Sequence, residues 1–152
     1  MRAGFDAEIP LAQAPDVTFR LDATGQFTTA RLPAGEEFIL GGREQQRGFR
    51  FAEAQGDSGL SVNFEVGRDF IPETGAVLRA RPFAFADFGQ IWNNDPSMGE
   101  VSDIALASAG FGVELQLNGD LFIRTHMGFP LTDGVTQTTR DPAVYLGITR
   151  SW

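Results

Sequence analysis

The fold of this chain is decided by residues 38–67, which read FILGGREQQRGFRFAEAQGDSGLSVNFEVG. Within residues 60–67, apolar side chains at the even positions alternate with polar residues or glycine at the odd positions, which is typical of a two-faced β-strand. Residues 38–59 are rich in glycine and also carry the apolar Phe38, Leu40 and Phe49. Hairpin loops usually have roughly two to five residues, so a longer and partly apolar connection is expected to pack against the rest of the protein.

The same alternation continues through most of the chain and predicts about six strands, at residues 17–27, 60–67, 78–89, 105–117, 121–131 and 144–152. Several of these segments reach the roughly 9 to 11 residues of a tilted transmembrane strand, whereas ordinary strands have about five or six. Helical periodicity does not extend beyond a turn or two, and Asn118-Gly119 predicts a tight turn between two strands. The predicted fold class is therefore all-β and antiparallel.

Composition excludes several classes of function. The chain has 20 acidic and 12 basic residues, a net charge of -8, which argues against binding of nucleic acid. The absence of cysteine excludes disulfides, thiol catalysis and cysteine metal sites. The longest apolar stretch, residues 104–113, is shorter than the roughly 18 residues of a membrane-spanning helix. Residues 12–14 imitate a signal-peptidase site, but no apolar core precedes them, so no signal peptide is expected.

Two architectures fit this pattern. In a soluble sandwich the apolar strand faces point inward, and Phe83, Phe85 and Phe88 would then belong to the core. In an outer-membrane barrel the apolar faces point to lipid and the polar faces line the lumen. Strand length, the alternation of short turns with long loops at 94–103 and 132–142, and the terminal aromatic Trp152 favour the barrel.

Three short motifs in the long connection are spaced as in a known family: Gly41-Gly42, Arg47-Gly48-Phe49 and Gly56-Asp57. They resemble the outer-membrane transporters of two-partner secretion, of the haemolysin secretion and activation type, which share a superfamily with the barrel-assembly insertases. The resemblance implies a 16-stranded barrel, of which this chain would be the C-terminal segment. It also implies that the loop at about 31–59 enters the lumen, with Arg47, Gly48 and Phe49 at its tip.

A second family motif, Phe-x-Asp-x-Gly, matches Phe85, Asp87 and Gly89. In the family this motif lies on the inner barrel wall, and the resemblance implies that Arg47 pairs with Asp87. The chemistry is suitable, because a planar guanidinium group can donate two parallel hydrogen bonds to one carboxylate.

The end of the chain, with Tyr145, Gly147 and Trp152, resembles the signal by which barrel proteins are recognised for insertion, although Arg150 stands where a hydrophobic residue is usual. This resemblance implies the barrel-assembly machinery as a partner. Residues 1–152 are expected to form one partial barrel domain, without the periplasmic polypeptide-transport-associated domains and the signal peptide of the family, so the chain is expected to be a fragment.

The resemblance implies a pore in the outer membrane of a Gram-negative cell that exports a partner exoprotein of the haemolysin or adhesin type. Its expected partners are this cargo, outer-membrane lipid and the barrel-assembly machinery, with no nucleic acid, cofactor or metal and no enzymatic activity. Two alternatives stay open: a segment of a barrel-assembly insertase, and a soluble all-β binding or adhesin module.

Two further groups of residues have ordinary explanations. The single histidine, His126, is expected to be a hydrogen-bonded side chain and not a catalyst, because no nucleophile partner is indicated. Asp95, Glu100 and Asp103 do not have the spacing of a calcium loop and are expected to form a solvated loop.

Overall fold

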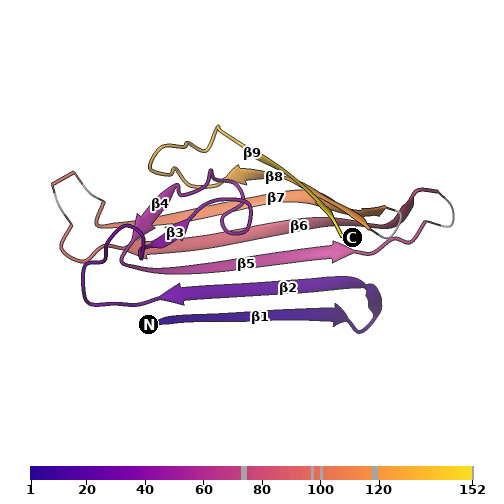
Figure 1. Ribbon diagram of the computed structural model, residues 1–152, viewed down its shortest axis with the longest axis horizontal. Coiled ribbons are helices and arrows are strands. Elements are labelled where there is room, and N and C mark those ends of the chain that lie inside the picture. Colours follow the sequence, from indigo (N-terminus) through magenta and orange to yellow (C-terminus); the bar gives the residue numbers. More distant parts are fainter. Residues whose placement is uncertain (73–74, 97, 100, 118–119, 152) are drawn as a thin grey trace.

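The computed structural model describes residues 1–72, 75–96, 98–99, 101–117 and 120–151. These residues form an antiparallel sheet in the order β1-β2-β5-β6-β7-β8-β9, together with the separate pair β3-β4 (Figure 1). The strands are β1 (Arg2–Leu11), β2 (Ala14–Gln26), β3 (Phe38–Leu40), β4 (Ala54–Gly56), β5 (Ser58–Arg68), β6 (Val77–Trp92), β7 (Asp103–Leu117), β8 (Leu121–Pro130) and β9 (Ala143–Arg150). None of the described residues belongs to a helix that is long and apolar enough to cross a membrane.

The predicted all-β class is confirmed. In the described residues the main sheet has seven strands, where the sequence predicted about six. The additional strand is β1, whose apolar positions include Ala3 and Ala7 and therefore contrast weakly with its polar positions. Pro10 is tolerated there because the register shifts at Pro10/Leu11, and such an irregularity is one of the places where a strand accepts proline. The short strands β3 and β4 inside the long connection were not expected either. The predicted turn at Asn118-Gly119 lies outside the described residues, although β7 and β8 pair as a hairpin up to Leu117 and Leu121.

The sheet exposes its apolar face and buries its polar face, which is the reverse of the arrangement in a soluble protein. The outer face is apolar and exposed, with Phe19 46%, Phe64 55% and Phe111 58% accessible. One row of neighbours across the strands on this face runs Phe19, Val66, Ala84, Phe111, Met127 and Val144. The inner face carries polar side chains that are buried, among them Asn63 and Glu65. This is the arrangement of a membrane barrel wall and not of a sandwich core.

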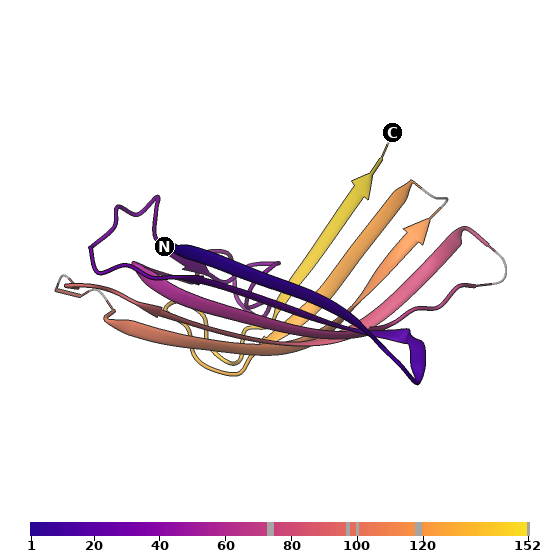
Figure 2. The same cartoon turned by 90° about the horizontal axis from the view of Figure 1, so that it is seen from below.

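The sheet curves toward its inner face. Arg20 Nη1 on β2 lies 3.3 Å from Glu114 Oε1 on β7, although β5 and β6 separate these two strands in the sheet. In the view from below, β9 points well away from the direction of β1, as expected of a strongly twisted sheet (Figure 2). The inner face is therefore concave, and the long connection lies on it.

The connections at the two ends of the strands differ in length. At one end, which we call the long-loop end, are the connections 27–57, 93–102 and 131–142. At the other, the short-turn end, are the connections 12–13, 69–76 and 118–120. A small apolar core lies between the long connection and the sheet, and it is formed by Phe38, Leu40, Phe49, Ala54, Ile91 and Leu106. The connection 27–57 is therefore packed and not a free solvent loop.

Candidate functional site

The site is built around Arg47, in the long connection between β3 and β4. Its guanidinium group meets both oxygens of Asp87 on β6, with Nη2 2.7 Å from Oδ1 and Nε 3.1 Å from Oδ2. The Arg47 backbone N–H also donates to Asp87 Oδ2, at 2.8 Å. The guanidinium carbon lies 3.9 Å from the centre of the Phe85 ring. The structure thus brings together Arg47, Phe85 and Asp87, the residues that the resemblance had linked.

A second carboxylate, Glu65 on β5, shares Arg47 with Asp87. Arg47 Nη1 donates to Glu65 Oε2 at 2.6 Å, Arg81 Nη1 to Oε1 at 2.6 Å and Arg124 Nη2 to Oε2 at 2.7 Å. The Glu65 side chain is only 5% exposed. Arg20 Nη1 also donates to Glu65 Oε1, at 3.4 Å. Because four guanidinium groups surround one buried carboxylate, Glu65 is the centre of the network and not a peripheral contact.

Cross-strand pairing extends this network over the five strands β2, β5, β6, β7 and β8. Arg20 is paired with Glu65 in the register of β2 and β5, and Glu114 on β7 is paired with Arg81 on one side and Arg124 on the other. Opposite charges at directly facing positions stabilise neighbouring strands. We call this set the wall charge cluster: Arg20, Arg47, Arg81, Arg124, Glu65, Asp87 and Glu114.

The charge of Arg47 is maintained in this setting. Burial disfavours the charged form, but the hydrogen bonds and charges of Asp87 and Glu65 outweigh it and raise the pKa of Arg47 above its usual value. The guanidinium group is therefore a permanent cation that holds the connection to the wall.

Two glycines of the motifs are required by close approach. A Cβ on Gly89 would lie 2.7 Å from both Gln46 Nε2 and Leu40 Cδ2. A Cβ on Gly48 would lie 2.5 Å from Ser108 Cβ, and the Gly48 N–H donates to Ser108 Oγ at 3.1 Å. Both glycines allow the tip of the connection to lie directly on β6 and β7.

The two ends of the connection 27–57 are joined through the buried side chain of Asp57, its last residue. Its Oδ1 accepts from the Leu32 N–H at 2.5 Å and its Oδ2 from the Asn94 N–H at 2.7 Å. Next to it, Gly56 packs so closely on Ile91 that a Cβ would lie 3.0 Å from the Ile91 Cβ. The Gly41-Gly42 pair has φ values of 95° and 121°, a backbone conformation that favours glycine. All the motif residues 41–57 thus serve to shape or anchor this connection.

The connection 131–142 covers the site from the long-loop end. The Glu53 carboxylate accepts from Thr136 N at 2.5 Å, Thr136 Oγ1 at 2.8 Å and Gln137 N at 2.9 Å. Gln137 in turn donates through Nε2 to Gly48 O at 2.8 Å, and its Oε1 accepts from Arg50 N at 2.9 Å. Sequence reasoning missed this contact, because it joins two irregular segments that carry no periodic pattern.

The residues of the expected C-terminal signal lie partly in the site. Tyr145 Oη donates to Phe49 O at 2.6 Å, so Tyr145 also holds the tip. Gly147 is on the same face, opposite Arg124 in the register, and Trp152 lies outside the described residues.

The expectation for His126 is wrong in one respect. Its ring is buried against Tyr145, with ring centres 5.2 Å apart, and neither ring nitrogen has a hydrogen-bond partner in the described part of the chain. Of the acidic loop residues, Glu100 lies outside the described residues, and Asp103 accepts a hydrogen bond from Ser102 Oγ.

The comparisons with known proteins agree with this geometry. The family model described as haemolysin secretion/activation protein ShlB/FhaC/HecB matches residues 1–115. Among solved structures, CdiB from Acinetobacter baumannii is similar, with a TM-score of 0.73 and 20% sequence identity. The match covers 98% of this chain and 26% of CdiB, so the chain spans about a quarter of that protein. At this identity the likeness concerns the fold alone. None of the curated proteins matches the chain in sequence.

Proposed function

The chain belongs to the haemolysin secretion/activation protein family, and we propose that it forms part of the wall of an outer-membrane pore that exports a partner protein. The members of this family are two-partner secretion transporters of the Gram-negative outer membrane. The predicted family, the all-β fold of a barrel segment and the outer-membrane location are therefore confirmed. Membership also decides against the insertase alternative, and the exposed apolar outer face argues against a soluble module.

The observation that carries the proposal is the attachment of the connection 27–57 to a polar, concave wall. An exporting pore needs a wall that does not bind apolar segments and an element that closes the lumen in the absence of cargo. The connection is suited to this second role, because Arg47 joins it to Asp87 and Glu65 by direct ion pairs. We take residues 31–59 to lie in the lumen and to leave the wall when cargo passes.

The polarity of the strands gives the direction of export. Outer-membrane barrels have short periplasmic turns and longer extracellular loops. The long-loop end is then extracellular and the short-turn end periplasmic, with the apolar outer face toward lipid. The exported partner is proposed to be a haemolysin- or adhesin-type exoprotein, and the segment with Tyr145, Gly147 and Trp152 is proposed to be recognised by the barrel-assembly machinery.

This function can be tested in a chimera in which the chain replaces the matching segment of CdiB. Its Arg47→Ala variant is expected to be inserted in the outer membrane at the normal amount but to lose export of the transporter's partner, measured in the culture medium. The matched control is Arg50→Ala, because the exposed Arg50 uses its backbone N–H for its bond to Gln137. Normal export by Arg47→Ala, or an equal loss in Arg50→Ala, would show that the Arg47 attachment has no part in export.

A further inference from the structure

The connection 131–142 between β8 and β9, which we call the strap, lies against the tip of the connection 27–57 at the long-loop end (Figure 1). Gln137 of the strap donates through Nε2 to Gly48 O at 2.8 Å and accepts from Arg50 N through Oε1 at 2.9 Å. In return, Glu53 of the connection accepts from the backbone N–H groups of Thr136 at 2.5 Å and Gln137 at 2.9 Å. Each segment thus supplies a side chain that binds the backbone of the other.

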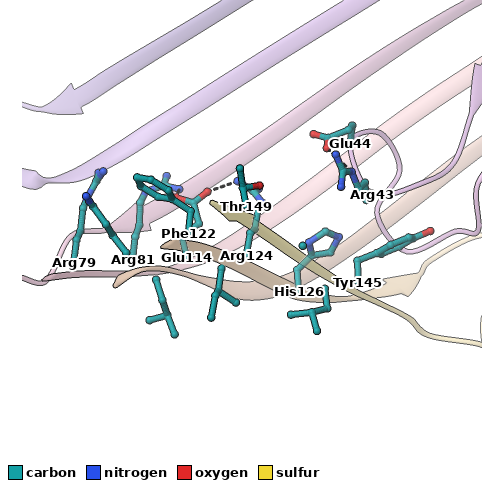
Figure 3. A pocket seen from close by; sticks show the side chains of 15 residues that line it. Arg43, Glu44, Arg79, Arg81, Glu114, Phe122, Arg124, His126, Tyr145 and Thr149 are labelled. Atoms are coloured by element: carbon teal, nitrogen blue, oxygen red, sulfur yellow. Dashed lines mark hydrogen bonds and ion pairs between the residues drawn. The ribbon is translucent and has the colours of Figure 1, made fainter. Parts of the chain in front are cut away.

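Gly48 is the point at which the strap and the barrel wall hold the same residue. Its N–H donates to Ser108 Oγ on β7 at 3.1 Å, and its C=O accepts from Gln137. Tyr145, close to the beginning of β9, extends toward the connection and donates from Oη to Phe49 O at 2.6 Å (Figure 3). The tip is therefore enclosed between the wall and the strap, and it can leave the wall only if the strap releases it or moves with it.

The two side chains that join the strap to the connection are buried, with Glu53 5% and Gln137 2% exposed. Gln137 Nε2 also donates to Asp141 O within the strap, which fixes the orientation of the amide. Hydrogen bonds to a carboxylate are stronger than those between neutral groups, and a buried polar group that loses its partner is strongly disfavoured. Partial separation would leave such groups unpaired, so we expect the strap to be either fully attached or fully released.

The strap also has internal hydrogen bonds that do not involve the connection 27–57. Asp141 Oδ2 accepts from Thr138 N at 3.2 Å and from Thr138 Oγ1 at 3.0 Å, and Asp133 Oδ1 accepts from Thr139 N at 2.9 Å. Such bonds from side chains to the nearby backbone stabilise turns locally. The strap can therefore separate from the connection as a unit, with its own turns intact.

We propose that the strap is a second attachment of the connection 27–57, independent of Arg47, and that it has to release Gly48 and Glu53 before the connection leaves the wall. The inference rests on the proposed function and adds a gating step to the same pore. Arg47 holds the connection to the wall by charge, whereas the strap holds it from the long-loop end through backbone groups. Movement of the strap and the connection together is the competing mechanism, in which these bonds stay intact during export.

The first test joins the two segments by a disulfide in a cysteine-free form of the CdiB chimera. A Cβ at position 134 would lie 2.9 Å from Glu53 Cγ, hence at most about 4.4 Å from Glu53 Cβ, and a disulfide spans roughly 3.5 to 4.5 Å between Cβ atoms. The oxidised Glu53→Cys/Gly134→Cys variant is expected to lose export, and a reducing agent should restore it. The two single variants are the controls, because their export should not respond to oxidation. Equal export by the oxidised and reduced double variant would show that the strap stays attached, and would overturn the proposal.

A second test does not require a disulfide and measures how often the chimera opens in planar lipid bilayers. Gln137→Ala and Glu53→Gln are each expected to raise the frequency of pore opening about tenfold, which corresponds to about 1.4 kcal/mol of lost hydrogen bonding. The matched control is Glu44→Gln, because Glu44 is also a carboxylate of the connection but is exposed and paired with Arg43. An unchanged frequency in the two strap variants, or an equal increase in Glu44→Gln, contradicts the proposal.

Combined variants separate the two attachments. Glu53 and Arg47 share no hydrogen-bond partner in the described part of the chain, so Glu53→Gln should raise the opening frequency by the same factor with and without Arg47→Ala. A clearly different factor would refute the independence of the strap. If the oxidised variant is blocked while Arg47→Ala exports normally, the strap stands and the Arg47 attachment has no part in export. The opposite pair of results removes only the strap.

Discussion

Replacement of Arg47 by alanine should release the tip of the connection 27–57 while the sheet stays folded. The Asp87 side chain is fully buried and loses both guanidinium bonds. It keeps the backbone N–H of residue 47 at 2.8 Å and Ser108 Oγ at 3.5 Å, neither of which supplies a positive charge. Glu65 keeps Arg81 and Arg124 and is therefore less affected. Breaking a buried ion pair by removing one partner costs roughly 3 to 5 kcal/mol, because a charge is left without compensation, and access of water to the lumen reduces this value.

Amide hydrogen exchange measures this free energy directly, because protected amides exchange through local opening. At about 1.4 kcal/mol per factor of ten, a loss of roughly 3 to 5 kcal/mol corresponds to an acceleration of about 100- to 4,000-fold, and access of water moves the value toward the lower end. It is expected in peptides covering residues 44–52 of the CdiB chimera, analysed by mass spectrometry. Residues 58–68 of β5 should keep their wild-type exchange, because the strand ladder does not depend on Arg47.

Two variants complete the experiment. Arg50→Ala should exchange as the wild type does, since the bond at Arg50 is made by its backbone. In the double variant Arg47→Ala/Asp87→Asn the acceleration should not exceed that of Arg47→Ala alone, because the uncompensated charge has been removed as well. Unchanged exchange in Arg47→Ala, or additive effects in the double variant, would refute the assignment of the ion pair as the attachment.

Three further substitutions test separate contacts. Gly89→Ala places a Cβ 2.7 Å from Leu40 Cδ2. Because this overpacks the contact, amide exchange in residues 44–52 should accelerate by about tenfold or more. Wild-type exchange would show that Leu40 moves aside without loss of stability. Phe64→Arg puts a charge on the exposed outer face. For a position near the membrane midplane, the free energy of unfolding of the barrel should fall by about 2 to 4 kcal/mol, measured by denaturant titration in lipid vesicles. An unchanged denaturation midpoint would show that Phe64 does not face lipid. Tyr145→Phe removes the bond to Phe49 O and should cost about 0.5 to 1.5 kcal/mol, seen as faster exchange of residues 44–52 with normal insertion of the barrel; an equal rate would mean that this hydroxyl does not hold the tip.

The strands could be predicted from sequence because a period of two is a local property. Segments such as 60–67 and 105–117 alternate clearly, and their strands differ from the prediction by only a few residues at each end. β1 was missed because the alanines at positions 3 and 7 give little contrast. Alternation could not show which face is outside, since a sandwich and a barrel wall have the same pattern; the exposed apolar face of the structure decides this point.

The site was only partly predictable for a different reason. Arg47 and Asp87 were linked through family motifs, and no physical rule applied to the sequence alone joins residues this far apart. Arg81, Arg124 and Glu114 are on the polar faces of their strands, but their convergence on Glu65 depends on register and on the curvature of the sheet. The contact between Glu53 and Gln137 joins two loops, so no strand pattern could have indicated it.

The orientation of the wall is the central claim, and lipid-phase quenching tests it most directly. The chain has no cysteine, so single cysteines at positions 61 to 66 can carry a fluorophore in a cysteine-free form of the chimera, reconstituted with nitroxide-labelled lipid. Quenching should alternate, strong at the even positions of the outer face and weak at the odd positions below the connection 27–57. Uniform quenching, or strong quenching at the odd positions, would contradict a wall with its polar face toward the lumen.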